Sequence, residues 1–262
     1  MKSFVWHDAD SYLHRLNPLT KLVLTVPVVV VVSRASNPLA PLGIMLVAVL
    51  ATWLLGRVPW RRLLAPMGFA LVLSLGMFWM GALFYANPGG SYAPGPVGLS
   101  SASLINGLTM ASRLLAIFAA SLLFVLTTDP VKLVLALIHQ ARIPYKIGYT
   151  VFASYRFIPL FQEELDNIRA AHLMRQGAGG SPLRRLRRSL GYTVPLLAVA
   201  VRKGERVALA MDARAFGVLP RRTYYRRTEF AVHDVEFIAG AALALAAIVL
   251  AAHQIALLEG LP

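Results

Sequence analysis

Apolar residues occur in long blocks along this chain, separated by short polar segments. Blocks of this length indicate helices that cross a membrane. The strong blocks are Leu22–Val32, Leu39–Leu55, Leu63–Tyr85, Leu104–Leu126 and Phe237–Leu258, and weaker ones lie at 130–139 and Ile147–Phe161. We therefore predict an all-α integral membrane protein with about five transmembrane helices, in which 130–161 forms a hairpin or a re-entrant piece.

Asn-Pro or Asp-Pro pairs mark the starts of several of these helices. Asn17 can cap a helix whose first turn holds Pro18, and 37–38 repeats the Asn-Pro pair. The segment TTDP at 127–130 offers another cap followed by a proline. The helix that starts at Leu19 is only just long enough to cross a bilayer, so we expect it to be short or tilted.

The chain of 262 residues is 57% hydrophobic and carries 26 basic and 12 acidic residues, a net charge of +14. Nucleic-acid binding is one explanation of such an excess. In a protein with several membrane spans the commoner cause is the accumulation of Lys and Arg in cytoplasmic loops, so we expect no nucleic-acid partner. The absence of cysteine excludes disulfides and Cys-ligated metals. The first 21 residues lack an uninterrupted apolar core, so no signal peptide is expected.

The basic residues are concentrated in two places. Residues 163–227 contain fourteen basic and five acidic side chains and no membrane-length apolar run, and 57–62 contains three arginines, whereas the Gly- and Pro-rich loop 86–98 is uncharged. The distribution predicts a multi-pass membrane protein with the N-terminus and both basic segments inside and 86–98 and the C-terminus outside. Three parts follow: N-terminal membrane helices in 1–161, a cytoplasmic helical region in 162–227, and a C-terminal transmembrane helix in 237–258.

Within the cytoplasmic region, 181–201 has leucine and valine at spacings of three and four, with arginines in the gaps. This pattern predicts a basic amphipathic helix, capped at Ser181 and kinked at Pro195, that lies along the inner leaflet or contacts a partner. The arginines concerned are Arg184, Arg185, Arg187 and Arg188.

Two further helices are expected at about 170–177 and 202–217, each with small residues and one arginine near its end. Small residues allow helices to cross closely; those expected to do so are Ala170, Ala171, Ala208 and Ala210. Arg175 and Arg214 either interact with the helix dipole, worth roughly 0.3–1 kcal/mol, or enter pockets of a partner. Gly177 and Gly217 are expected to end the helices.

The distribution of titratable residues disfavours an enzyme and an ion-coupled transporter. Between Asp10 and Asp129 there is no carboxylate, and the six histidines have no metal-ligand spacing. Catalysis and proton or sodium coupling both normally need such groups. No Walker A pattern occurs, so the chain is not expected to bind ATP in that way. Arg113, the one deep charge, either anchors a partner or pairs with a backbone carbonyl, unless the membrane span begins nearer to it than Leu104.

Several segments, in order, resemble the transmembrane T component of energy-coupling factor (ECF) transporters, the group that includes cobalt and biotin transporter subunits. The segment LNPLTKL (16–22) is similar to the family's DPRTKL, RIPYKIGY (142–149) resembles its G(I/L)P segment, and YRFIPLFQEELDNIRAA (155–171) is very similar to a third. The family has two Ala-Arg-Gly-like motifs. They correspond to Met174–Gly177, which departs from the pattern, and to Ala213–Gly217, which is close.

The resemblance implies a non-catalytic scaffold in a bacterial inner-membrane transporter for a vitamin, a vitamin precursor or a metal ion. Two ABC ATPase subunits, which would carry ATP and Mg²⁺, would bind the coupling helices, and a separate S component would bind the substrate. No cofactor would be bound by this chain. The implied ATPase-coupling residues are Arg175, Gly177, Ala213, Arg214, Ala215 and Gly217. A basic membrane-surface adaptor and a permease of another transporter class are the alternatives.

Overall fold

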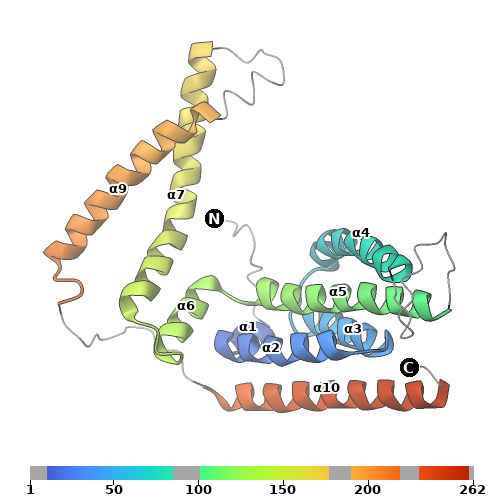
Figure 1. Cartoon of the computed structure of the whole chain (residues 1–262). Helices are drawn as coiled ribbons and strands as arrows, with labels where there is room; N and C mark the ends of the chain where they lie inside the picture. Colours follow the sequence, from blue (N-terminus) through green and yellow to red (C-terminus); the bar gives the residue numbers. More distant parts are fainter. Residues whose placement is uncertain (1–10, 85–100, 177–189, 219–229, 260–262) are drawn as a thin grey trace. The chain divides into compact units, whose positions relative to one another are not determined.

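The computed structural model describes residues 11–84, 101–176, 190–218 and 230–259, with the side chains of 175–176 and 256–259 outside the description. Every regular element in these ranges is a helix (Figure 1). The chain forms two compact units. One, here called the bundle unit, comprises Met1–Ala136 and Thr228–Pro262, and the other, the hairpin unit, comprises Leu137–Arg227.

The bundle unit holds most of the apolar helices. Its elements are α1 (Tyr12–Arg15), α2 (Pro18–Arg34), α3 (Leu39–Leu54), α4 (Trp60–Leu83), α5 (Ser101–Thr127), most of α6 (Pro130–His139) and α10 (Val232–Glu259). Among the described residues α4, α5 and the Val232–Ile255 part of α10 are long and apolar enough to cross a membrane, and α3 and α6 are shorter apolar helices. The predicted all-α membrane fold is confirmed.

The first apolar helix, α2, is as short as its sequence indicated. α2 has 17 residues and α3 has 16, so each extends about 25 Å, less than the ~30 Å hydrocarbon core of a bilayer. The Asn17 side chain accepts a hydrogen bond from the Leu19 N–H at 3.0 Å, the predicted cap. The second Asn-Pro pair behaves differently, because Pro38 itself is the N-cap of α3 and no side chain caps that helix.

α5 forms the centre of the bundle unit and packs against α2, α3 and α4. Its buried positions are mostly small, among them Ala116 and Ser112. The closest approach is to α4, where a Cβ added to Gly107 would lie 2.6 Å from the Phe78 carbonyl oxygen and one added to Gly81 would lie 2.9 Å from the Gly107 Cα. The two backbones can therefore meet here only because both positions are glycine.

Arg113, in the middle of α5, contacts the end of α2. Its Nε and Nη2 both donate hydrogen bonds to the Ala35 carbonyl oxygen, at 3.1 and 2.6 Å. Ala35 is the C-cap of α2, and the last carbonyls of a helix have no partner within the helix and carry its negative dipole end. Of the two roles considered for Arg113, pairing with a backbone carbonyl is the one observed.

Two buried polar side chains join helix ends in the bundle unit. The Asp234 carboxylate accepts the N–H of Asn17 at 2.7 Å and the N–H of Ala231 at 2.9 Å, and these residues directly precede α2 and α10. The Lys21 ammonium donates to the Thr127 carbonyl oxygen at 2.8 Å, at the end of α5. Both contacts place a side-chain charge at the helix end of opposite sign, and together they connect three helix termini.

In the hairpin unit, α7 (Tyr145–Gln176) and α9 (Thr193–Ala213) correct the boundaries expected from the sequence. The apolar segment Ile147–Phe161 and the first coupling helix are one continuous helix of 32 residues. Of the helix predicted over 181–201, residues 181–189 lie outside the described part; the helical assignment at 190–191 is interrupted at Tyr192, and Pro195 lies in the first turn of α9, where proline is tolerated. The unit boundary after Ala136 does not test the predicted membrane boundary at 161, which stays a prediction.

Candidate coupling site

α7 and α9 form an antiparallel helical pair. The His172 ring, late in α7, meets the Tyr192 ring edge-on at a centroid distance of 5.0 Å, just before α9 begins. In the middle of α9, the Lys203 ammonium lies 3.6 Å from the Glu164 carboxylate, which is earlier in α7 than His172. The contacts therefore lie earlier in α7 as the chain proceeds along α9, and Figure 1 shows α9 beginning beside the late part of α7 and diverging from it toward its own C-terminal end.

The contact face of α9 is only half-buried. Its partly covered residues recur at spacings of three and four, which is the period of one helix face: Leu196, Val199, Ala200, Lys203, Val207 and Met211. No residue of α9 is fully buried. The helical pair is therefore held at a few points and leaves most of the α9 surface open.

α9 ends in a Schellman turn that includes the second arginine motif. Arg214 is the C-cap, the Ala215 N–H donates to the Asp212 carbonyl at 2.9 Å, and the Phe216 N–H donates to the Met211 carbonyl at 3.0 Å. Ala215 has φ of 53°, a left-handed conformation that favours glycine. The third position of the Ala-Arg-Gly-like motif is thus the residue that reverses the chain. The helix stops there, two residues before the stop expected at Gly217.

Aromatic contacts attach this turn to the start of α7. The Phe216 ring lies 4.8 Å from the Tyr149 ring and 5.8 Å from the Tyr145 ring, measured between centroids. Gly217 has φ of 90°, and a Cβ there would lie 3.1 Å from the Lys146 side chain. The turn is therefore fixed on both sides, by its own hydrogen bonds and by packing on α7.

Arg214 is exposed at this fixed turn. Within the described residues, no ion pair or hydrogen bond engages its guanidinium group. Its position at the C-cap places the positive charge beside the last carbonyls of α9, where the helix dipole favours a cation. The arrangement presents a five-donor fork at a defined place on the surface, which is suited to carboxylate or carbonyl groups of another molecule.

The other predicted site residues are found in less defined surroundings. Arg175 belongs to the last turn of α7, and nothing of its side chain is described. Gly177 and the four arginines of the predicted amphipathic helix lie outside the described residues, the latter being Arg184, Arg185, Arg187 and Arg188. Ala213 and Ala215 are exposed beside Arg214.

The small residues expected at a close helix crossing are open to solvent in this unit. Ala170 and Ala171 of α7 and Ala208 and Ala210 of α9 are all exposed. The contacts between the two helices are made by larger side chains instead. A role for the four alanines in packing stays a prediction, and the surface that they form is uncovered in the isolated chain.

The sequence interpretation missed the three aromatic rings that hold the arginine turn. Their signal was present, because Tyr145 and Tyr149 are four residues apart and therefore share one helix face. Phe216 stands directly in the second motif segment. Only the pairing between the two segments needed the three-dimensional structure.

The fold and the site define an α-helical membrane protein that presents an exposed arginine on a helical hairpin. Residues 9–225 match the family described as CbiQ, cobalt transport protein. The energy-coupling factor transporter transmembrane protein EcfT of Limosilactobacillus fermentum is 30% identical over 239 residues, covering 86% of each chain. EcfT of Bacillus selenitireducens is 29% identical over 238 residues (86% of this chain, 87% of the relative), and EcfT of Bacillus subtilis 27% over 239 (87% and 89%).

The family model and the extent of these similarities settle the family. The chain belongs to the CbiQ/EcfT family and is a transmembrane component of an ECF transporter. The resemblance stated from the sequence motifs is confirmed.

Proposed function

We propose that this chain couples two ABC ATPase subunits to a substrate-binding S component during ATP-driven uptake. The hairpin unit binds the ATPases, which carry ATP and Mg²⁺, and the membrane helices hold the S component. The chain itself binds no cofactor and catalyses no reaction. Movement of the ATPases on ATP binding displaces the hairpin, and the membrane helices pass that displacement to the S component.

The observation that carries this proposal is the geometry of Arg214. The Schellman turn and Phe216 fix the backbone on either side of the arginine, while its side chain stays exposed. Arginine is a typical anchor residue, and a backbone that is already fixed around it loses little conformational entropy when the side chain enters a pocket. Arg175, in the last turn of α7, supplies the second contact, so that each ATPase subunit receives one arginine.

The charge distribution supports the orientation in the cell membrane. Arg57, Arg61 and Arg62 follow α3, and the hairpin unit is strongly basic, so both face the cytoplasm under the positive-inside rule. The C-terminus then lies outside. Arg184, Arg185, Arg187 and Arg188 contact anionic lipids of the inner leaflet, each contributing on the order of 1 kcal/mol.

The substrate is a vitamin, a vitamin precursor or a metal ion. The family description names cobalt transport, and the names of the EcfT relatives state no substrate. Because substrate is bound by the S component in this proposal, one chain of this type can serve any of these classes.

The proposal is tested by co-expressing the full chain with its ATPase and S-component partners. The Arg214→Ala variant should lower ATPase binding by about 2 kcal/mol or more, the cost of removing an anchor residue. Arg175→Ala should have a smaller effect, and the double variant should abolish uptake and co-purification of the ATPases. The matched control is Arg206→Ala, which removes an exposed arginine from the same helix. Full uptake by a normally folded double variant would overturn the coupling role.

A further inference from the structure

The hairpin unit is inserted into the bundle unit, so the chain crosses between the two units twice. It leaves the bundle unit through α6, which begins at Pro130, three residues after the end of α5. It re-enters the bundle unit at Thr228, and α10 begins four residues later, at Val232. Along the chain, a displacement of the hairpin unit therefore reaches the membrane helices at the end of α5 and at the start of α10.

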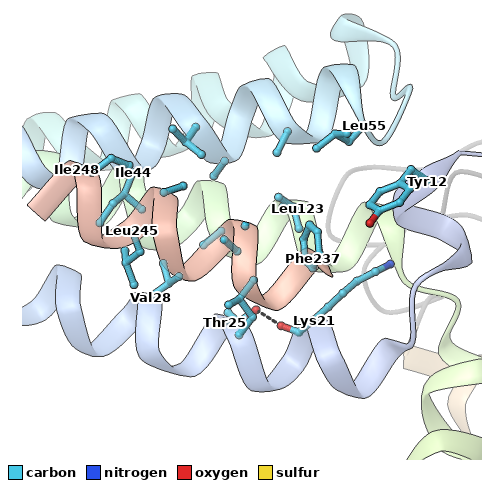
Figure 2. A pocket seen from close by; sticks show the side chains of 18 of the residues that line it. Tyr12, Lys21, Thr25, Val28, Ile44, Leu55, Leu123, Phe237, Leu245 and Ile248 are labelled. Atoms are coloured by element: carbon cyan, nitrogen blue, oxygen red, sulfur yellow. Dashed lines mark hydrogen bonds between the residues drawn. The ribbon is translucent and has the colours of Figure 1, made fainter. Parts of the chain in front are cut away.

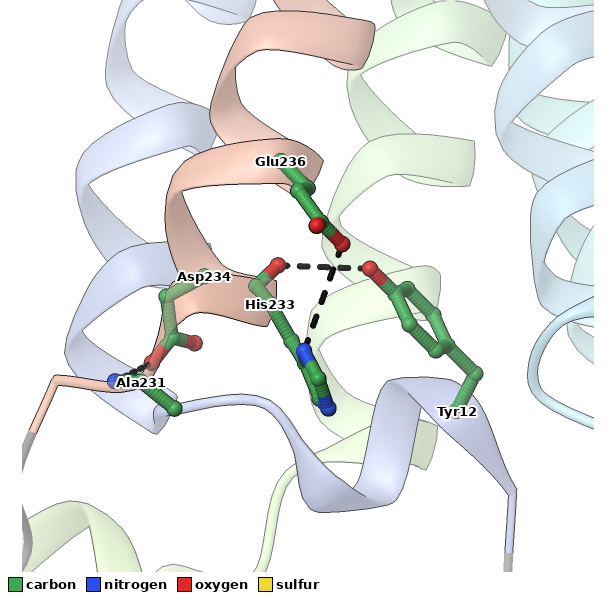
Figure 3. Close-up of polar contacts among 5 residues, drawn as sticks. All are labelled: Tyr12, Ala231, His233, Asp234 and Glu236. Atoms are coloured by element: carbon green, nitrogen blue, oxygen red, sulfur yellow. Dashed lines mark hydrogen bonds and ion pairs between the residues drawn. The ribbon is translucent and has the colours of Figure 1, made fainter.

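The start of α10 is joined to the start of α2 by one carboxylate. Asp234, in the first turn of α10, is only 2% exposed. One of its oxygens accepts the N–H of Ala231, the residue before α10, at 2.9 Å (Figure 3), and the other accepts the N–H of Asn17, the N-cap of α2, at 2.7 Å. The first contact resembles the return contact of a capping box, and the second extends the same cap to another helix. Because both helices present the positive ends of their dipoles, a single carboxylate stabilises both starts.

The end of α5 is joined to the same part of α2 by Lys21. Its ammonium donates to the carbonyl oxygen of Thr127, the last residue of α5, at 2.8 Å, and to the Thr127 hydroxyl at 3.4 Å. Figure 2 shows the Lys21 side chain directed toward Tyr12, away from aliphatic side chains such as that of Leu245. Asn17 and Lys21 are four residues apart, so they lie on one face at the beginning of α2. Both chain crossings are thus held at one place.

The residues at this place are buried although they are polar. Asn17, Thr20 and Lys21 are all buried at the beginning of an otherwise apolar helix. A buried cation in a membrane helix is costly even when its hydrogen bonds are made, and such residues usually have a function. An aliphatic side chain at position 21 would avoid this cost, but it could not hold the α5 carbonyl. The contact itself is therefore what Lys21 contributes.

Away from this place, α2 packs loosely against α10. An apolar cavity of about 370 Å³ is lined by α2, α3, α5 and α10, and Figure 2 shows Val28, Ile44 and Ile248 in its walls. A second apolar cavity, of about 400 Å³, lies between α2 and α10 along another face, beside Val31 and Val249. A helix that borders cavities loses few contacts when it shifts, whereas α5 meets the backbone of α4 at two glycines. Of these helices, α2 is therefore the one that can shift at low cost.

We propose that Lys21 and Asp234 are positioning residues that pass a displacement of the hairpin unit to α2. This inference rests on the coupling function proposed above. Movement of either chain crossing acts on a helix end that is hydrogen-bonded to the beginning of α2, so α2 must follow or the contact must break. At Asp234 the start of α10 moves with it. The two helices then shift against the α4–α5 pair, and this change is passed to the S component.

The test is pulsed electron paramagnetic resonance of the assembled transporter, prepared with cysteine-free ATPase and S-component partners. The chain has no cysteine, so two introduced cysteines can carry the spin labels without other changes. The pair Val26→Cys and Val72→Cys reports movement of α2 against α4, and the pair Arg206→Cys and Val72→Cys reports movement of the hairpin unit; all three positions are exposed. In the otherwise unchanged chain, ATP with Mg²⁺ and vanadate should shift both distances, by on the order of 1–2 Å for α2.

Two variants should separate these shifts. Lys21→Met and Asp234→Asn should reduce the α2 shift at least roughly twofold and leave the hairpin shift unchanged. Methionine keeps an unbranched apolar side chain without the donor. Asparagine replaces one of the two accepting oxygens by a donor, so it can hold only one of the two helix starts. The ATPase subunits should co-purify at normal levels, because the hairpin unit is unaltered, and a loss of the α2 shift alone is not expected from a general loss of stability.

Each variant has a matched control. Arg113→Met is the control for Lys21→Met, because Arg113 of α5 donates to the Ala35 carbonyl at the other end of α2. It therefore removes the same kind of contact between the same two helices, away from both chain crossings. Asp129→Asn is the control for Asp234→Asn, because it makes the same change at a carboxylate that caps α6 rather than joining two helices. Both controls should keep the α2 shift, whatever their effect on thermal unfolding.

The failure of this inference and the failure of the coupling function give different results. A hairpin shift without an α2 shift in the otherwise unchanged chain would overturn the inference and leave the coupling function standing. The same follows if both variants keep the full α2 shift, or if Arg113→Met loses it as fully as Lys21→Met does, since the contacts would then only stabilise the fold. If the hairpin distance does not respond to nucleotide, the coupling function itself is wrong, and the inference fails with it.

Discussion

The two helix pairs α4–α5 and α7–α9 both contain small residues, and they use them in opposite ways. Gly81 and Gly107 lie inside the α4–α5 contact, where added Cβ atoms would collide with backbone. In the hairpin unit, Ala208 and Ala210 are exposed, and the helices meet through larger side chains such as His172 of α7.

The difference shows that a row of small residues predicts a close contact but not the partner in that contact. In the bundle unit the facing helix is supplied by the same chain, so the contact is closed. In the hairpin unit no residue of α9 is fully buried, and the small-residue surface is left open. An open surface of this kind beside a fixed arginine fits a helix that acquires its partner on assembly, as proposed above.

The largest expected effect comes from breaking the closed contact. Gly107→Leu would force a Cβ to within 2.6 Å of the Phe78 carbonyl and separate α4 from α5. We expect a loss of about 3 kcal/mol in the free energy of unfolding, the upper end for overpacked sites. Thermal unfolding in detergent measures it. Gly76→Leu, at an open position of α4, should change stability little. Equal stability of the two variants would show that the glycine contact is not tight.

In the hairpin unit, the corresponding variant is Phe216→Ala, which removes the contact between the arginine turn and the start of α7. Its effect on stability should be smaller than that of Gly107→Leu, because it involves one side chain rather than a whole helix contact. Loss of the ring contacts with Tyr145 and Tyr149 should cost about 1–2 kcal/mol. Amide hydrogen exchange in the full chain should rise around 205–218 and stay unchanged in α4 and α5. Phe216→Leu keeps apolar volume and should recover part of the protection. Unchanged exchange in Phe216→Ala would mean that the rings do not hold the turn.

These two contacts also show which features the sequence could provide. The membrane helices were recognisable because apolar blocks record burial in lipid, and the caps at Asn17 and Asp129 were recognisable because capping is local. The helix boundaries in the hairpin unit could not be predicted in this way. Polar residues interrupt the apolar pattern at Glu163, yet α7 continues through them. A helix is continuous when its backbone hydrogen bonds are, whatever solvent surrounds each half.

Contacts between distant segments were the other omission. Arg113 was noticed as a buried charge, but its pairing with the Ala35 carbonyl depends on how α5 lies against α2. The small residues on both sides of Arg214 are visible in the sequence. The feature that ends the helix is the left-handed backbone of Ala215, and the sequence could not predict it because alanine rarely adopts that conformation.

Ala215 provides a finer test of the hairpin end. Ala215→Gly should stabilise the turn by about 0.5 kcal/mol, because the left-handed penalty of roughly 1 kcal/mol exceeds the entropic cost of glycine. Exchange of the Ala215 and Phe216 amide protons should then slow about twofold. Ala213→Gly, two residues earlier and inside α9, should have the opposite sign. The same sign in both variants would contradict the Schellman geometry.

The smallest expected effect on the isolated chain tests the open surface itself. Ala208→Leu and Ala210→Leu add volume at exposed positions, so the free energy of unfolding should change by less than about 0.5 kcal/mol, in contrast to Gly107→Leu. If this surface is covered on assembly, the same variants should weaken co-purification of the ATPase subunits, because the added side chains keep the partner at a distance. Val201→Ala, an exposed position earlier on α9, is the control. Normal assembly of both leucine variants would mean that the alanines stay uncovered in the transporter, and that Arg214 alone defines the contact at this end of the hairpin.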